Sequence, residues 1–311
     1  MDIVSALVCT CNRSGSLLRT VRSLLTGDDA HVELLVIDQS DGSESEDALA
    51  SLVSDSRLRY VRVRSRGKGA ALNEGLQLAR GEIIACTDDD CEAPPGWVRA
   101  MAATLAERPT AAIVFCNVVA PAYDTRAGYI PTYRRRRSRL LRSIGATCGG
   151  HGMGAGMAVR RDVVLSLGGF DEELGPGARF PSGDDWDISH RALLSGWHVY
   201  ETARLSIVHH GFRTLAEGRE HARRDWLAIG ALCAKPLRAG RFSAVVVPIW
   251  VFSAQALWPP VHGLFRLRRP SGLARISGFV RGFAQGLRTS VDRKTLLFRP
   301  APGTVRPSEF A

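Results

Sequence analysis

The first 120 residues alternate between short apolar runs and amphipathic stretches. The apolar runs predict strands at residues 3–8, 32–37, 58–63, 82–86 and 111–118. Apolar residues at helical spacing predict helices between them, at 14–25, 48–53, 70–79 and 97–106. This order indicates an α/β fold with a mostly parallel, Rossmann-like central sheet flanked by helices. In such sheets ligands bind in the crevice at the carboxyl ends of the strands.

The regular pattern stops between residues 123 and 156. Six arginines lie within 134–142, and a glycine-rich stretch follows at 145–156. The arginines suit a diphosphate group or a lipid headgroup, with a solvated loop as the alternative. Periodicity returns further on, and we predict a helix over 184–194 and a last strand over 199–208.

Three adjacent acids, Asp88, Asp89 and Asp90, directly follow the fourth predicted strand. Their charges repel one another, so a folded crevice holds them only with a cation or hydrogen-bond donors nearby. Carboxylate oxygens are hard ligands that suit Mg²⁺ or Mn²⁺ shared with substrate phosphates. A solvated acidic turn is the alternative, which the apolar strand before the acids and the proline-rich turn after them disfavour.

A second acidic cluster, DDWD at 184–187, opens the predicted helix. Acids in a first turn offset the helix dipole, which is the purely structural interpretation. Three acids are more than such capping needs, and a carboxylate that points into a crevice can serve as a general base. His209 and His210 end the last predicted strand, where a histidine is either structural or a metal ligand.

The positive charge of the chain is concentrated at its end. Residues 1–200 hold 23 basic and 25 acidic side chains, whereas residues 201–311 hold 18 and 6. A basic region beside apolar sequence indicates an anionic membrane surface. Nucleic acid is not expected as a partner, because the basic region lacks interleaved aromatic residues and any known binding module.

The 24 residues from 242 to 265 contain no charged side chain, and arginines flank them on both sides. About 20 apolar residues can span a bilayer, so the length permits a span. Pro248, Pro259 and Pro260 interrupt the run, so we expect a membrane-surface helix or a half-inserted hairpin. Helices packed on the preceding domain are the alternative.

The composition excludes several classes of protein. With 45% hydrophobic and 23% charged residues, the chain is neither disordered nor collagen-like. Seven cysteines without a CxxC pair indicate neither a disulfide scaffold nor a zinc ribbon. Because Met1 leads directly into a predicted strand, we expect no signal peptide and a cytoplasmic location.

Six segments stand in a distinctive order along the chain. They are VSALVCTCNR at 4–13, LLVIDQSDGS at 34–43, GKGAALNEGLQLARG at 67–81, the acidic segment at 82–97, GMAVRRDVVLSLGGFDEEL at 156–174 and DDWDISHR at 184–191. In this order they resemble the inverting glycosyltransferases of family 2, which have the GT-A fold. The resemblance covers about two-thirds of the chain, from Val4 to about Arg213.

The resemblance implies specific roles for the acidic clusters. Asp185 corresponds to the catalytic base and Asp184 to its acidic neighbour, while Arg191 either orients their helix or reaches a phosphate. A bound divalent cation, Mn²⁺ or Mg²⁺, is also implied, with His209 as one of its ligands and His210 as the alternative to His209. The implied metal ligands are Asp90, Asp88 and His209. The implied nucleotide-sugar-binding residues are Thr10, Arg13, Asp38, Lys68, Asp88 and Asp89.

The sequence also departs from the family pattern. Cys9 and Cys11 replace the usual Pro and Tyr of the opening turn, which removes an aromatic stack on the nucleotide base. Leu72 replaces a common Arg. No Gln-x-x-Arg-Trp motif is present, so transfer of single sugars is favoured over processive polymer synthesis.

The resemblance implies a catalytic domain over 1–215, with a nucleotide-binding half (1–120) and an acceptor-binding half (121–215) that carries the base helix. Residues 216–311 are expected to form a basic, apolar, helical region in contact with the inner face of the cell membrane, through 235–290.

The implied function is inverting transfer of one sugar from a nucleoside-diphosphate sugar to an acceptor hydroxyl. Envelope glycan or exopolysaccharide assembly is the expected setting, with a lipid-linked saccharide as acceptor. Two alternatives remain open: a catalytically inactive, transferase-like membrane scaffold, and a sugar nucleotidyltransferase.

Overall fold

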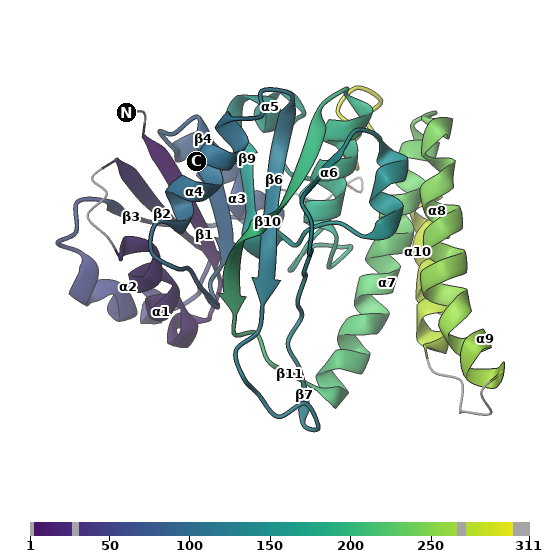
Figure 1. Cartoon of the computed structure of the whole chain (residues 1–311), viewed down its shortest axis with the longest axis horizontal. Coiled ribbons are helices and arrows are strands. Elements are labelled where there is room, and N and C mark those ends of the chain that lie inside the picture. Colours follow the sequence, from purple (N-terminus) through teal and green to yellow (C-terminus); the bar gives the residue numbers. More distant parts are fainter. Residues whose placement is uncertain (1–2, 27–30, 266–271, 301–311) are drawn as a thin grey trace.

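The computed structural model describes residues 3–26, 31–265 and 272–300. Within them, a nine-stranded sheet has the order β3-β2-β1-β4-β9-β6-β10-β5, with β8 also paired to β10 (Figure 1). The strands of this sheet are β1 (Val4–Thr10), β2 (Val32–Asp38), β3 (Leu58–Arg62), β4 (Ile83–Asp88), β5 (Cys91–Glu92), β6 (Ala111–Val119), β8 (Arg139–Leu141), β9 (Met157–Arg160) and β10 (His198–His209).

Most strands of the sheet run in one direction. β3, β2, β1 and β4 are parallel neighbours, and β6 is parallel to β10. β9 is inserted between β4 and β6 and is antiparallel to both. The short strands β5 and β8 are antiparallel to β10. The predicted α/β fold with a mostly parallel sheet is therefore confirmed.

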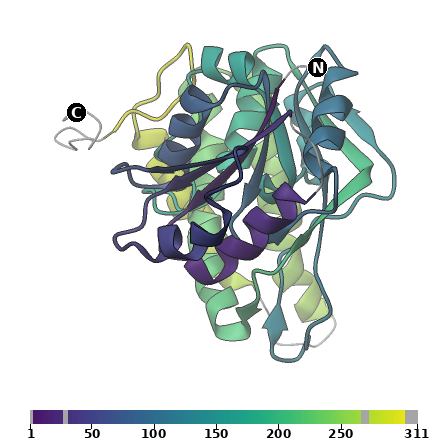
Figure 2. The same ribbon diagram turned by 90° about the vertical axis from the view of Figure 1, so that its left-hand side faces the viewer.

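Helices cover both faces of the sheet (Figure 2). On one face, α1 (Ser14–Leu25) and α4 (Trp97–Ala106) bury side chains such as Leu17 and Met101 against the strands. On the other face lie α3 (Lys68–Leu78), α5 (Arg161–Ser166) and α6 (Asp184–Leu194). Burial of these apolar faces stabilises the sheet from both sides.

The C-terminal helices stand side by side at one end of the sheet (Figure 1). Glycines spaced four residues apart on α10, including Gly278 and Gly282, lie so close to α7 that a Cβ atom would meet its backbone. The helices share an apolar core around Trp226 and Phe279. A two-stranded sheet lies at the start of α7. These elements are β7 (Gly128–Tyr129), β11 (Arg213–Thr214), α7 (Leu215–Arg238), α8 (Val246–Trp250), a π-helical turn (Val251–Leu257), α9 (Trp258–Phe265) and α10 (Leu273–Arg288).

The predicted helices at 14–25, 97–106 and 184–194 have the observed bounds of α1, α4 and α6. The helix predicted over 48–53 was wrongly placed, because α2 is Glu44–Leu49 and a 3-10 turn follows it. Acids in the first turn of α2 offset the helix dipole and favour the earlier start.

Candidate active site

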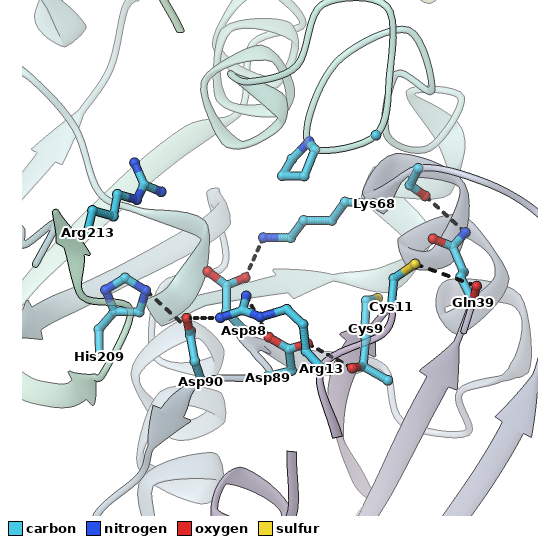
Figure 3. Close-up of a pocket in the computed structure, with 14 residues that line it drawn as sticks. Cys9, Cys11, Arg13, Gln39, Lys68, Asp88, Asp89, Asp90, His209 and Arg213 are labelled. Atoms are coloured by element: carbon cyan, nitrogen blue, oxygen red, sulfur yellow. Dashed lines mark hydrogen bonds and ion pairs between the residues drawn. The ribbon is translucent and has the colours of Figure 1, made fainter. Parts of the chain in front are cut away.

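A cavity of about 340 Å³ opens at the carboxyl ends of β1 and β4, where the sequence predicted a crevice. Three basic side chains converge there on the three adjacent aspartates (Figure 3). The cavity is lined by Cys9, Thr10, Cys11, Arg13, Gln39, Gly67, Lys68, Asp88, Asp89, Asp90, Pro176, Gly177, His209 and Arg213.

Strand pairing brings His209 to the acidic turn. β4 ends at Asp88, and the chain then turns into β5, in which Cys91 lies opposite His209 of β10. The Nε2 atom of His209 is 3.3 Å from Asp90 Oδ1. Its Nδ1 is 3.1 Å from the carbonyl oxygen of Pro131, which can only accept a hydrogen bond, so Nδ1 carries a proton and Nε2 is the nitrogen that faces the acids.

Arg13 forms ion pairs with two of the three acids. Its guanidinium lies 3.0 Å from Asp89 and 2.6 Å from Asp90. Burial alone would raise the pKa of Asp90, but His209 and Arg13 hold it well below its usual value. Burial raises the pKa of Asp89 to about 6, against the opposing effects of Arg13 and of a hydrogen bond from Thr10.

The donor set fits a divalent cation. One ligand atom each from Asp88, Asp90 and His209 lie within 4.8 Å of one another. Two carboxylates and one imidazole suit Mn²⁺ or Mg²⁺, and a partly open cavity leaves room for phosphate oxygens beside them. His210, the alternative histidine, instead lies 3.0 Å from Glu92. The geometry thus favours His209 as the third ligand.

Lys68 lies between the two acidic clusters. Gly67, with a φ of +91°, turns the chain into α3, and the Lys68 amide donates to the carbonyl of Pro176 at 2.9 Å. The Lys68 ammonium then pairs with Asp88 and lies 4.0 Å from Asp184. Burial works against its charge, but the two acids raise the pKa of Lys68, so it stays protonated.

The second acidic cluster opens α6 beside the cavity. Gly183, with a φ of +84°, precedes the helix, and the cluster occupies the first turn. Asp185 Oδ2 accepts a hydrogen bond from the backbone amide of Gly154 at 2.7 Å. Burial, supported by the neighbouring charge of Asp184, raises the pKa of Asp185 to about 7. A carboxylate with this pKa is suited to general base catalysis near neutral pH.

Asp38 is not among the residues that line the cavity. It is fully buried and accepts hydrogen bonds from the Tyr60 hydroxyl at 2.6 Å and from the Ser40 amide at 2.8 Å. Its neighbour Gln39 lines the cavity and donates to Ser65. A direct contact of Asp38 with the nucleotide therefore stays a prediction, and the described geometry gives it the role of supporting the turn that presents Gln39.

Several lining residues were not identified from the sequence. Pro176 lies in a loop and Arg213 in the short strand β11, neither with a recognisable motif, and their position depends on tertiary packing. Gln39 had a local signal, since it directly follows the acidic end of a predicted strand.

The burial and the partners of Arg191 and of the 134–142 arginines bear on two expectations from the sequence. Arg191 is buried and donates to Asp187 and to two backbone carbonyls, so it orients α6 and does not reach a phosphate. Within the 134–142 cluster, Arg139 is paired with the buried Glu201, while Arg134 and Arg142 are exposed. Part of that cluster is therefore structural.

Comparison with known proteins gives a family match and several similar proteins. Residues 5–167 match the model of the family described as "Glycosyl transferase family 2". The chain is 27% identical over 188 residues to glucosyl-dolichyl phosphate glucuronosyltransferase of Haloferax volcanii, which covers 55% of the chain and 57% of that protein. It is 25% identical to beta-monoglucosyldiacylglycerol synthase of Trichormus variabilis, over 64% of the chain and 43% of the relative. The chain thus spans about half the length of these relatives.

Solved structures share the fold over most of the chain. Mannosyltransferase PcManGT from Pyrobaculum calidifontis, in complex with GDP-Man and Mn²⁺, superposes with a TM-score of 0.61 and 18% identity, over 91% of this chain and 86% of that one. S. aureus TarS 1–349 in complex with UDP-GlcNAc gives a TM-score of 0.62 and 14% identity, over 92% and 81%. These likenesses establish the GT-A type of fold. With a family match over more than half of its residues, the chain belongs to glycosyl transferase family 2.

Proposed function

We propose that the protein is an inverting glycosyltransferase that moves one sugar from a nucleoside-diphosphate sugar to an acceptor hydroxyl. The observation that carries this proposal is the arrangement of two acidic clusters on either side of Lys68, one of which lines the cavity. One cluster faces His209 and fits a divalent cation. The other offers Asp185, whose pKa of about 7 suits a base.

The proposed chemistry is a single displacement. The acceptor oxygen forms a bond to the anomeric carbon while the bond from that carbon to the diphosphate oxygen breaks. Asp185 takes the acceptor proton, and the diphosphate leaves with the electron pair. Arg13 and Lys68 lie where they can balance the charge of the diphosphate. A cation held by Asp90 and His209 would supply further electrostatic stabilisation of the leaving group.

Two features of the chain, its acids and the loop after its first strand, argue against the two alternative functions. An inactive scaffold has no need of a base or of a clustered ligand set, whereas this chain holds acids that could serve as both. A sugar nucleotidyltransferase normally has a Gly-rich, basic loop after the first strand, whereas residues 10–15 here contain one arginine and one glycine. Envelope glycan or exopolysaccharide assembly, with a lipid-linked acceptor, is the proposed setting. The names of the two relatives support the lipid part of this proposal, since one refers to a dolichyl-phosphate-linked sugar and the other to a glucosyl diacylglycerol.

A thermal-shift panel tests the donor site. Sugar nucleotides based on UDP, GDP and dTDP, and the corresponding nucleoside triphosphates, are added to the purified protein with and without Mn²⁺. Because a ligand that binds only the native state raises the melting temperature, we expect one of them to raise it by about 5 °C at about 100 times its Kd, in the presence of Mn²⁺. A folded protein that responds to none would contradict the proposal. A response to nucleoside triphosphates alone would favour the nucleotidyltransferase.

We also propose that the protein works at the inner face of the cell membrane, on its cytoplasmic side. Helix residues Phe242–Gly263 are long and apolar enough to span a bilayer by length and composition, and 33% of an 18-residue apolar window within them is buried. Its outer face exposes Phe242, Ile249 and Trp258 by 73%, 62% and 56%. Arg238 and Arg241 precede it. An apolar stripe beside arginines fits the surface of an anionic bilayer.

Vesicle sedimentation tests this contact. We expect the protein to sediment with vesicles of phosphatidylcholine and phosphatidylglycerol, and less so at high salt. Ile249→Glu should weaken the association about tenfold, because it removes a large apolar side chain from the membrane surface. Val53→Glu is the matched control, since Val53 is 81% exposed in a different part of the fold. Equal sedimentation of Ile249→Glu and wild type would contradict the proposed contact.

A further inference from the structure

One buried charge lies outside the cavity and outside the chemistry proposed above. Lys235 is the only charged residue between Trp226 and Leu237 of α7. Its side chain is 1% exposed. Its ammonium lies 2.5 Å from a carboxylate oxygen of Asp171 and 2.5 Å from one of Asp187.

These groups form a closed network of two cations and two carboxylates. Asp187 also accepts from the Arg191 guanidinium at 2.7 Å. Arg191 donates to the backbone carbonyls of Leu167 and Gly169, at 2.8 and 2.6 Å. Both oxygens of Asp171 are used, since Oδ1 accepts from the backbone amide of Glu173 and Oδ2 from that of Phe298 as well as from Lys235. The charges are therefore balanced and fully hydrogen-bonded.

Stability alone does not account for Lys235. The residues packed around this part of α7, such as Leu232 and Phe298, belong to an apolar core. Apolar side chains of similar volume are often as stabilising as a buried ion pair, because the pair must be stripped of water. What the ion pair adds is a fixed geometry. An ammonium that pairs with two carboxylates holds the chain segments that carry these groups at one separation.

The segment that Lys235 holds is the start of the base helix. Asp187 and Asp185 lie two residues apart in the first turn of α6. From outside α6, the backbone amide of Gly154 donates a hydrogen bond to the Asp185 carboxylate. The position of its carboxylate relative to the cavity therefore depends on where the first turn of α6 is anchored, and Lys235 anchors that turn to α7.

We propose that Lys235 is a positioning residue for sugar transfer, which holds Asp185 in place by tying the first turn of α6 to α7. The inference rests on the proposed function, because that function gives Asp185 its role as base. It places part of the catalytic machinery in residues 216–311, which the sequence pattern assigned to membrane contact. The C-terminal region then completes the active site as well as facing the membrane.

A charge-balanced double variant tests this role. Lys235→Met with Asp171→Asn removes one positive and one negative charge, so Asp187 and Arg191 still neutralise each other. We measure release of nucleoside diphosphate, with water as acceptor, from the sugar nucleotide that gives the largest shift in the thermal panel. We expect kcat to fall about 10- to 100-fold, because a small misplacement of a reacting group has effects of this size. KM and the donor-induced melting shift should stay near wild type.

Two further readouts separate positioning from general destabilisation. In the double variant, amide hydrogen exchange should increase in α6 but not in α1. The acid limb of the kcat profile should move, since Asp185 would occupy a changed environment. Arg219→Met is the control on α7, because Arg219 is exposed and lies outside this network. Asp187→Asn probes the same ion pair from α6 and should give the same loss of kcat, even if the double variant fails to fold.

The outcomes are distinguishable from those of the proposed function. Wild-type kcat in a folded Lys235 variant, with Asp185→Asn inactive, would overturn the inference and leave the proposed function standing. A rise in KM at unchanged kcat would overturn it too. Wild-type turnover in Asp185→Asn would show that Asp185 is not the base. The inference, which gives Lys235 the role of positioning that base, would then be overturned together with this part of the proposed function.

Discussion

Asp185→Asn should lower the rate of sugar transfer by about 10²- to 10⁴-fold, the range that general base catalysis contributes. The amide keeps the shape of the side chain but cannot take a proton from the acceptor. Nucleoside diphosphate release measures the rate, and the donor-induced melting shift should remain, because Asp185 does not line the donor cavity. Asp124→Asn is the control, since Asp124 is an exposed acid that pairs with Arg126.

The pH profile gives this prediction a second readout. Burial and the neighbouring Asp184 raise the pKa of Asp185 to about 7, and only the carboxylate form can accept a proton. The wild-type rate should therefore increase as the pH rises to about 7 and should be lower at more acidic pH. The residual activity of Asp185→Asn should lack this limb. A wild-type rate in the variant, or the same acid limb in both proteins, would exclude Asp185 as the base.

The sequence predicted those parts of the site whose positions depend on local features of the chain, such as the end of a strand or the start of a helix. The acids at 88–90 follow a strand end, and the carboxyl ends of parallel strands meet at one edge of a sheet. The amphipathic pattern of 184–194 placed the start of α6, and with it Asp185, at the observed residue. His209 required one further fact, the pairing of β10 with β5, which only the folded sheet supplies.

Other parts of the site have no local signal. Nothing in the sequence around Asp38 shows that Tyr60 donates to it, or that Gln39 rather than Asp38 lines the cavity. Lys235 was visible as one charge in an apolar stretch, but its partners lie 48 and 64 positions earlier in the chain. Such contacts depend on packing between distant elements, which periodicity does not encode.

The division into a catalytic domain over 1–215 and a region over 216–311 stays a prediction. Its boundary falls one residue after the start of α7 at Leu215. The apolar run at 242–265 is helical, with Pro248 inside α8 and Pro259 inside α9. Its buried side chains join the core of α7 and α10, so packing on neighbouring helices and exposure of an outer face occur together.

Asp90→Ala should abolish the dependence of donor binding on Mn²⁺. Asp90 offers a carboxylate to the ligand group, and its low pKa keeps it ionised at any pH at which the enzyme is assayed. Loss of a metal ligand removes several kcal/mol of transition-state stabilisation, so we expect turnover to fall by about 10³-fold. The measurement is the melting shift with sugar nucleotide, with and without Mn²⁺, together with nucleoside diphosphate release.

The two adjacent histidines make this prediction specific. His209→Ala should reproduce the loss seen in Asp90→Ala, because His209 faces the acids, whereas His210→Ala should not, because His210 faces Glu92. Arg13 keeps its contact with Asp89 in all three variants, so the acidic turn retains a counter-charge and the effect reports on the cation. A Mn²⁺-dependent shift that survives in Asp90→Ala and His209→Ala would show that donor binding does not use this ligand group.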